Sequence, residues 1–303
     1  MANSTPITVI DRETGKAFHE KILGEKWIRW AYQDGNATTL ESLLFRSSLI
    51  STLMGWWYDS PFSKGKIDSA IHELEINEWE FASPKESYGS FNEFFARHLK
   101  DGTRPFDPAP ENIVSPADGR VLVFPKLDED TFAPVKGHPF NIRKMLPVAS
   151  EHFINGSLAI IRLCPADYHR YHFPCAGKIV QSRDFAGALH SVNPIALGSG
   201  PDVFGENKRS YTMIQTPNIG TYCYVEVGAF GVGSIINTKT DGSVQKMEEK
   251  GYFKFGGSTV VLVFEQNKIR FSEDLIANSA AGHETLIKVG QPLASAIEKT
   301  DKK

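Results

Sequence analysis

Cysteine is scarce in this chain of 303 residues, which contains only Cys164, Cys175 and Cys223. These residues form no Cys-x-x-Cys pair and one is left over, so we expect neither a disulfide framework nor a cysteine-built zinc site. The pattern favours a reducing compartment. Basic residues are not in excess either, because 33 Lys and Arg stand against 36 Asp and Glu and leave a formal net charge of −3. Nucleic acid is therefore not an expected partner.

Long hydrophobic runs are also missing. No run of about eighteen apolar residues occurs, and the first residues, MANSTPITVIDRETGK, lack a basic segment followed by an apolar stretch. We therefore expect neither a membrane-spanning helix nor a secretory signal peptide. Internal repeats and low-complexity segments are not visible, and 41% hydrophobic with 23% charged residues is typical of a globular protein.

The first hundred residues show helical periodicity. Apolar residues recur at helical spacing over residues 18–32, and a second apolar segment over residues 40–58 follows a capping-box pattern at residues 38–41. The same capping pattern at residues 90–93 predicts a short helix that runs through Leu99. We therefore expect a helical region at the start of the chain.

From residue 107 onward the pattern changes to short β-rich runs separated by Gly and Pro. Strands are predicted at residues 121–124, 158–163, 211–215, 222–227 and 259–264. No stretch between them is long enough for the crossover helix of a parallel βαβ unit. The sequence thus predicts an α+β fold, with a helical region over residues 1–106 and a mainly antiparallel, β-rich domain over residues 107–303.

The two amphipathic segments of the helical region allow two interpretations. Four tryptophans lie on them, with basic residues nearby: Trp27, Trp30, Trp56 and Trp57, with Lys21, Lys26, Arg29 and Arg46. Indole and cationic side chains favour the headgroup region of a bilayer, so these segments could dock on a membrane surface. Alternatively, they form a helical layer that covers the β core.

Histidines and an aspartate in the β-rich part could carry chemistry. Asp118 with Gly119 precedes a predicted strand and would by itself be an ordinary turn. His169 and His172 lie three residues apart among aromatic residues, which suits acid/base work, metal binding or a structural role. His190 begins a polar stretch that could meet a phosphate or simply be a solvated loop.

A fourth pattern lies near the end of the chain, where Gly256 and Gly257 precede Ser258 and a predicted strand. Two glycines before a strand are consistent with a hairpin turn or a bulge. They also permit a strained backbone and a close approach to a carbonyl group, which a serine that cleaves the backbone would need.

Taken in order, these patterns resemble the phosphatidylserine decarboxylase family. The matching residues are Asp118, His169 with His172, and Gly257-Ser258, together with SFNEFF at residues 90–95, Arg104-Pro105, YVEVGA at residues 224–229 and GSI at residues 233–235. The resemblance covers most of the chain. The common family sequence is Leu-Gly-Ser-Thr, whereas this chain has Gly-Gly-Ser-Thr at residues 256–259, a variant of one branch of the family.

The resemblance implies a proenzyme that cuts itself between Gly257 and Ser258, into a β chain of residues 1–257 and an α chain of residues 258–303. Ser258 then becomes an amino-terminal pyruvoyl group, a covalent cofactor made by the chain itself. A serine hydroxyl needs a base that a third group orients. The resemblance assigns these roles to His172 and Asp118, and it assigns His169 to the later protonation of the substrate carbanion.

The reaction implied is decarboxylation of phosphatidylserine to phosphatidylethanolamine through a Schiff base with the pyruvoyl group. A lipid substrate favours the docking interpretation of the helical region, so we expect a peripheral protein on the cytoplasmic face of the cell membrane. The family further implies a homodimer of the processed αβ unit, and no metal is expected.

Two alternatives compete with this interpretation. A zinc hydrolase on a β scaffold would use Asp118, His169, His172 and His190 as ligands, although no HExxH helix accompanies them. A membrane-associated β module without enzymatic activity would make the Gly-Gly-Ser-Thr segment a plain turn.

Overall fold

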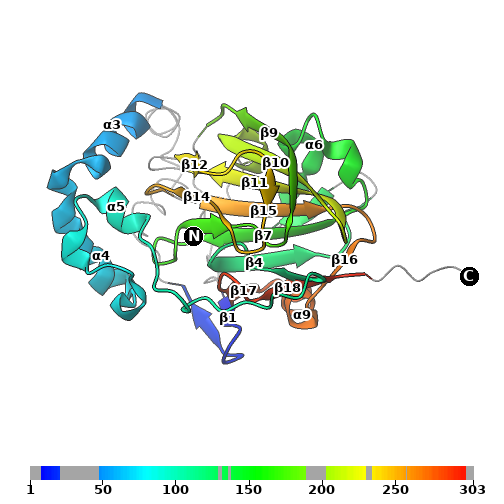
Figure 1. The fold of residues 1–303 in the computed structure, drawn as a ribbon, viewed down its shortest axis with the longest axis horizontal. Helices are drawn as coiled ribbons and strands as arrows, with labels where there is room; N and C mark the ends of the chain where they lie inside the picture. Colours follow the sequence, from blue (N-terminus) through cyan, green and yellow to red (C-terminus); the bar gives the residue numbers. More distant parts are fainter. Residues whose placement is uncertain are drawn as a thin grey trace, which may run out of the picture.

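A ten-stranded sheet is the centre of the computed structural model, which describes residues 8–20, 48–128, 132–135, 138–188, 203–229, 234–256 and 258–297 (Figure 1). Its pairs are antiparallel except for the parallel pair of β1 with β17. The strand order is β13 (Ser243–Val244), β9 (Gly177–Phe185), β10 (Arg209–Thr216), β11 (Gly220–Gly228), β15 (Ser258–Phe264), β7 (Ser157–Leu163), β4 (Gly119–Phe124), β17 (Glu284–Ile287), β1 (Thr8–Asp11) and β2 (Ala17–His19).

Three smaller sheets accompany it. Their strand orders are β12 (Ile235–Asn237), β14 (Glu249–Phe253) and β8 (Arg170–His172); β16 (Ile269–Phe271), β18 (Pro292–Ala296) and β3 (Asn112–Val114); and β5 (Phe132–Val135) with β6 (His138–Asn141). The helices of the amino-terminal part are α3 (Ser48–Asp59), η1 (Pro61–Lys66), α4 (Ile67–Leu74), η2 (Glu78–Glu80), η3 (Lys85–Ser87) and α5 (Phe91–Phe95). The later helices are α6 (Ile142–Met145), η4 (Ser150–Phe153), α8 (Val203–Glu206) and α9 (Glu273–Ala280). The α+β prediction is confirmed.

Both faces of the large sheet are covered, so its central strands bury apolar side chains on both faces. In β15 every residue is buried, with Val260, Leu262 and Phe264 in one hydrophobic cluster and Val261 with Val263 in another. This division follows from the alternation of side chains along a strand. The first cluster includes residues of β8, β14, β16 and α9, and the second includes residues of β6, α6, η4 and α8.

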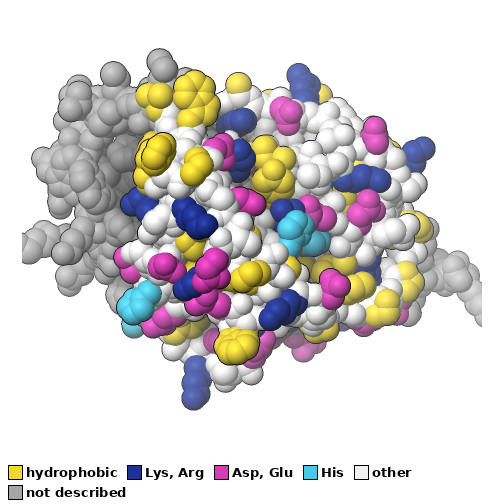
Figure 2. Space-filling view, turned by 60° about the vertical axis from the view of Figure 1, so that its left-hand side comes forward, with side chains coloured by type: hydrophobic (Ala, Val, Ile, Leu, Met, Phe, Trp, Pro, Cys, Tyr) yellow, Lys and Arg dark blue, Asp and Glu magenta, His cyan; other side chains and the backbone are white. Residues whose placement is uncertain are grey.

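The helices α3, α4 and α5 gather at one side of the sheet (Figure 1) and have a hydrophobic cluster of their own. Its buried members are Ile67, Ala70, Ile71, Phe81, Tyr88, Phe91, Phe94 and Phe95. Phe255, from the connection between β14 and β15, packs against this cluster. The outer face of this side carries hydrophobic side chains beside Lys and Arg side chains (Figure 2). The helical region is thus joined to the β domain at Phe255.

The sequence located the central strands correctly. All five predicted runs are strands, and Ser90 caps α5, because its Oγ accepts a hydrogen bond from the amide of Glu93 at 3.2 Å. The predicted helix was too long, since α5 ends at Phe95 instead of Leu99. Of the second predicted helix, the described part begins at Ser48 and ends at Asp59.

The prediction of a helix from Phe18 was wrong for its first three residues, the only ones of it that the structure describes. Phe18 and His19 lie in β2, which pairs with β1 at the edge of the large sheet. Val9 of β1 is completely buried, and β1 pairs with β17. The hairpin therefore depends on contacts with a segment far away in the sequence, which the local spacing of apolar residues cannot predict. Residues 21–47, with Trp27 and Trp30, lie outside the described residues. None of the described helices is long and apolar enough to cross a membrane.

Candidate active site at the start of strand β15

Ser258 is the first residue of β15, deep in the large sheet. Its neighbours across the ladder are Gly228 of β11 and Leu163 of β7, so the backbone is hydrogen-bonded towards both sides. The side chain is buried, and its Oγ has no hydrogen-bond partner among the described atoms. A buried hydroxyl without a partner is costly, which is typical of a group retained for chemistry.

Gly256, two residues before Ser258, has a φ of 146°. This value is rare for residues with a side chain, and glycine adopts it at little cost. It is the position at which the chain departs from the usual Leu-Gly-Ser-Thr pattern. Gly257, which the sequence predicts to supply the carbonyl that Ser258 attacks, lies outside the described residues.

His169 lies just before β8 and is fully buried. Its ring lies against Phe95, with the ring centres 3.8 Å apart, and its Nδ1 is 3.0 Å from the carbonyl oxygen of Asp167. An Nδ1–H donated to that carbonyl leaves Nε2 as the acceptor, and Nε2 has no partner among the described residues. Burial lowers the pKa of His169 to about 3, so the ring is neutral at physiological pH.

His172 ends β8 and is less buried than His169. Its Nδ1 is 3.0 Å from the carbonyl oxygen of Met247, and its ring stacks on Tyr168. Met247 has a φ of 65°, an unusual conformation for a residue with a side chain. Burial lowers the pKa of His172 below its ordinary value, so the ring can accept a proton at neutral pH.

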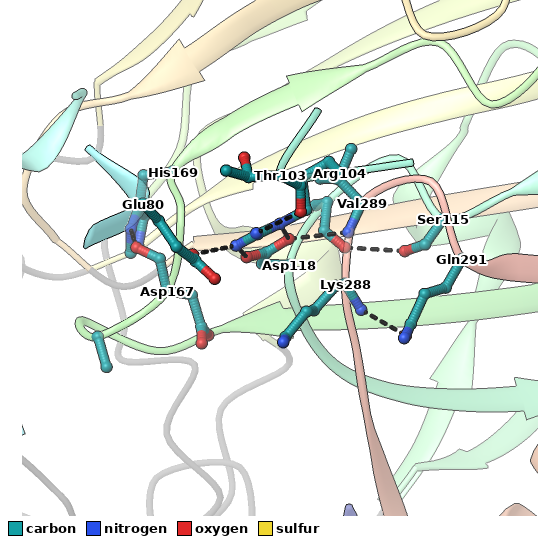
Figure 3. A network of polar contacts seen from close by, with 12 residues as sticks. Glu80, Thr103, Arg104, Ser115, Asp118, Asp167, His169, Lys288, Val289 and Gln291 are labelled. Atoms are coloured by element: carbon teal, nitrogen blue, oxygen red, sulfur yellow. Dashed lines mark hydrogen bonds and ion pairs between the residues drawn. The ribbon is translucent and has the colours of Figure 1, made fainter. Parts of the chain in front are cut away.

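Asp118 precedes β4 and is held in a polar network (Figure 3). Its carboxylate accepts hydrogen bonds from Arg104 at 3.0 Å and 2.6 Å and from the amide of Val289 at 2.8 Å. Arg104 also donates to Glu80 at 2.9 Å. Burial raises the pKa of Asp118 above its ordinary value, and the hydrogen bonds and charge of Arg104 oppose that shift.

The structure places Asp118 and His172 on adjacent segments. The amide of His172 donates to the carbonyl oxygen of Pro116 at 2.9 Å, which ties β8 to the loop that carries Asp118. No hydrogen bond joins the two side chains in the described part of the chain. Nδ1 of His172 is instead bonded to the Met247 carbonyl, and Arg104 binds the Asp118 carboxylate through two charge-assisted hydrogen bonds.

His169 is connected to the strand that leads to Ser258. Its carbonyl oxygen accepts a hydrogen bond from the amide of Phe253 at 2.9 Å, at the end of β14. Phe95, on which its ring lies, also contacts Phe255, with the ring centres 5.2 Å apart. Both predicted histidines therefore belong to the segment around β8 that pairs with β14, immediately before the Gly-Gly-Ser-Thr sequence.

A buried ion pair joins the large sheet to the small sheet that contains β14. Glu226 precedes Gly228 by two residues on β11, and its Oε1 is 2.5 Å from Nζ of Lys250 on β14. Both side chains are completely buried. The removal of such a pair from water is costly, so it is weak evidence for stability but fixes how the small sheet lies on the large one.

The described residues provide no ligand set for the zinc alternative. Among them, no three His, Cys, Asp or Glu side chains gather closely enough to hold a metal ion. Asp118 is bound by Arg104, and His190 lies outside the described residues.

Sequence reasoning missed several residues that hold this site. Arg104 appeared only within the family pattern, and its contact with Asp118 spans fourteen residues. Met247 gave no sequence signal, since neither its φ nor its carbonyl contact is visible in its side chain. Phe95 belonged to a recognised motif without an assigned role.

Comparison with known proteins agrees with the family pattern. Residues 91–295 match the family model described as phosphatidylserine decarboxylase. A phosphatidylserine decarboxylase proenzyme of Ruminiclostridium cellulolyticum is 36% identical over 299 residues, covering 98% of this chain and 100% of the relative. Proteins of the same name from Chlamydia trachomatis and Fusobacterium nucleatum are 41% and 39% identical over 287 and 292 residues. These matches cover 94% and 95% of this chain, and 95% and 97% of the relatives.

The burial of neutral His169 predicts sensitivity of the folded protein to acid. Its pKa is about 3 in the folded chain against 6.5 for the free side chain, so between these values only the unfolded chain takes up the proton. The free energy of unfolding should therefore fall as the pH drops below 6.5, by up to about 1.4 kcal/mol per pH unit from this group. Urea unfolding at several pH values measures this slope, and His169→Gln should reduce it. His72→Gln, at an exposed position of α4, is the control, and equal slopes for His169→Gln and the parent would contradict the prediction.

Proposed function

Because this chain belongs to the phosphatidylserine decarboxylase family and is a decarboxylase, we propose that it generates a pyruvoyl cofactor from its own Ser258. With this cofactor it converts phosphatidylserine to phosphatidylethanolamine. The observation that carries the proposal is the placement of Ser258. It lies buried at the start of a strand paired on both sides, with an unpartnered hydroxyl among the described atoms, directly after the Gly-Gly pair.

Cofactor formation requires only this chain and one water molecule. Ser258 Oγ attacks the carbonyl carbon of Gly257, and the amide bond becomes an ester as the Ser258 nitrogen takes up a proton. Loss of the Cα proton then expels the Gly257 carboxylate and leaves dehydroalanine at residue 258. Hydrolysis of its imine form by water releases ammonia and leaves the pyruvoyl group at the new amino terminus.

His172 is the proposed base for the first step. A hydrogen bond from Nδ1 to Met247 leaves Nε2 with a lone pair, and the lowered pKa keeps the ring neutral and ready to accept the proton. The negative charge of Asp118 favours the protonated ring that then forms, since it acts on His172 electrostatically without a hydrogen bond. Arg104 and Val289 hold that charge in place.

The residues around His169 suit the chemistry that the proposed cofactor would supply. When formed, the pyruvoyl group supplies the Schiff-base chemistry that accepts the electron pair left by the departing CO2. Phe95 and Phe255 provide an apolar wall near His169, which suits the loss of a charged carboxylate as neutral CO2. Nε2 of His169 is buried and has no partner among the described residues. A bound anionic headgroup would favour protonation of this nitrogen, and His169 could then donate the proton to the product carbon.

The exposed apolar side chains of the helical region support membrane docking. Leu53, Trp56 and Phe62 are 55%, 68% and 89% exposed, and Lys66 places its ammonium 5.5 Å from the ring centre of Trp57. Apolar side chains beside cations favour the interface of a bilayer. We propose that this surface docks on the cytoplasmic face of the cell membrane and that the processed αβ unit forms a homodimer.

Self-cleavage is the first consequence that can be measured. The wild-type chain should yield two pieces on a denaturing gel, residues 1–257 and 258–303, whereas Ser258→Ala, His172→Ala and Asp118→Ala should accumulate the full-length chain. His72→Ala is the control for a histidine outside the site, and circular dichroism checks that each variant is folded. A full-length wild-type chain with decarboxylase activity would falsify the proposal.

His169 should separate the two reactions. His169→Gln removes the proton donor and keeps a polar side chain of similar length, so the chain should still be cut while decarboxylation of phosphatidylserine falls by about 100-fold or more. The measurement is CO2 release per mole of cut protein, so that incomplete processing does not enter. Unchanged turnover by the cut variant would refute the assignment.

Docking predicts a difference between two substrates. The Trp56→Ala, Phe62→Ala double variant should bind anionic liposomes more weakly and lose turnover of long-chain phosphatidylserine, while turnover of a short-chain soluble analogue is retained. Each exposed aromatic that enters the interface contributes on the order of 1–3 kcal/mol. Trp79→Ala removes an exposed tryptophan from η2 and serves as the control. Equal loss on both substrates would place these side chains in the fold rather than at the membrane.

A further inference from the structure

The helical region contacts the chain immediately before the proposed cleavage site. Asn92 of α5 is buried, and its Oδ1 accepts a hydrogen bond from the backbone amide of Phe255 at 2.8 Å. Its Nδ2 donates to Oδ1 of Asp59, the last residue of α3, at 3.0 Å. The Asn92 side chain therefore uses both ends to join a helix of the amino-terminal region to residue 255.

Two further contacts act on the same short segment. Lys254 Nζ lies 3.0 Å and 2.8 Å from the two carboxylate oxygens of Asp59. The ring of Phe255 packs among Tyr58, Phe91 and Phe95, at centre distances of 4.5, 5.1 and 5.2 Å. The helical region thus binds the backbone amide and the ring of Phe255 and the ammonium group of Lys254. We call Asp59, Asn92, Lys254 and Phe255 the clamp.

The other side of the cleavage site is held by the sheet. Ser258 is paired with Gly228 and Leu163, and only Gly256 and Gly257 separate it from Phe255. Glycines give the backbone more freedom than any other residue, so a Gly-Gly pair needs outside contacts to keep one geometry. Attack within the chain depends steeply on the distance and direction between the reacting atoms, and an error of about 1 Å costs on the order of 100-fold in rate.

We propose that Asn92, oriented by Asp59, is a positioning residue for self-cleavage: it fixes the amide of Phe255 and thereby holds the Gly-Gly pair for attack by Ser258. This inference rests on the proposed function, because it assumes that the Gly257–Ser258 bond breaks. It assigns a role to the SFNEFF motif beyond the hydrophobic packing of α5. It also makes the helical region part of the maturation machinery, in addition to any docking surface.

An exchange of the two side chains tests the clamp. Asn92→Asp keeps an oxygen that accepts from Phe255, but it replaces the Nδ2 donor to Asp59 with a second carboxylate oxygen. The two carboxylates repel each other, so self-cleavage should slow by about tenfold or more. The double variant Asn92→Asp, Asp59→Asn restores a donor and an acceptor in the reverse direction and keeps an oxygen for Lys254. It should recover most of the wild-type rate. The rate is the loss of full-length chain with time after a pulse of cell-free synthesis.

Asn77→Asp is the matched control, since Asn77 accepts a hydrogen bond from Trp79 in η2 and no hydrogen bond among the described residues joins its side chain to the clamp. It should be cut at the wild-type rate. Each change is also made in a Ser258→Ala chain that cannot be cut, in which thermal unfolding reports stability alone. Asn92→Asp should remain folded there at the assay temperature.

The outcomes separate the two claims. Cleavage of Asn92→Asp at the wild-type rate, failure of the exchange to restore the rate, or unfolding of the Asn92→Asp, Ser258→Ala chain at the assay temperature would overturn the positioning role. A wild-type chain that stays full length would instead contradict the proposed function. Slow cleavage of Asn92→Asp with recovery by the exchange supports both.

Discussion

The double-sided pairing of β15 is the constraint on which the rest of the structure depends. Ser258 begins this strand between β11 and β7, so its backbone is fixed by ladder hydrogen bonds and by burial on both faces. Two residues before it, Gly256 has a φ of 146°, and Phe255 is bound by Asn92 of the helical region. Attack within one chain depends on how the reacting atoms are positioned, so both the pairing of Ser258 and the contacts of Phe255 bear on it.

Burial also determines the charge states around the site. His169 and His172 are neutral because the protonated form of a buried imidazole is poorly solvated. The charge of Asp118 persists next to Arg104, and the charges of Glu226 and Lys250 lie together in the interior. Each arrangement costs desolvation free energy, which the large apolar core offsets. A neutral His172 that interacts with the charge of Asp118 can take up and return a proton, which the proposed self-cleavage needs.

Local patterns in the sequence were sufficient for five central strands and for the cap of α5. Strands such as β4 and β15 are short, mostly apolar runs that begin at or after glycine. The Ser90 cap follows from hydrogen bonding between residues that are close in the sequence. Contacts between distant segments could not be predicted in this way. The Arg104–Asp118 pair, the Met247 carbonyl at His172 and the Asn92 contact with Phe255 depend on tertiary packing. Phe18 illustrates the same limit, because it lies in an edge strand paired with β1 although the spacing of nearby apolar residues predicts a helix.

The central claim is that Ser258 becomes the cofactor, and the mass of the smaller piece tests it most directly. Mass spectrometry of the separated fragment 258–303 should give a value lower, by the mass of one ammonia molecule, than the peptide beginning with serine. Reduction with borohydride should then add two hydrogen atoms to its amino-terminal residue. A fragment with an intact amino-terminal serine would show simple hydrolysis at Gly257–Ser258 and would contradict the account.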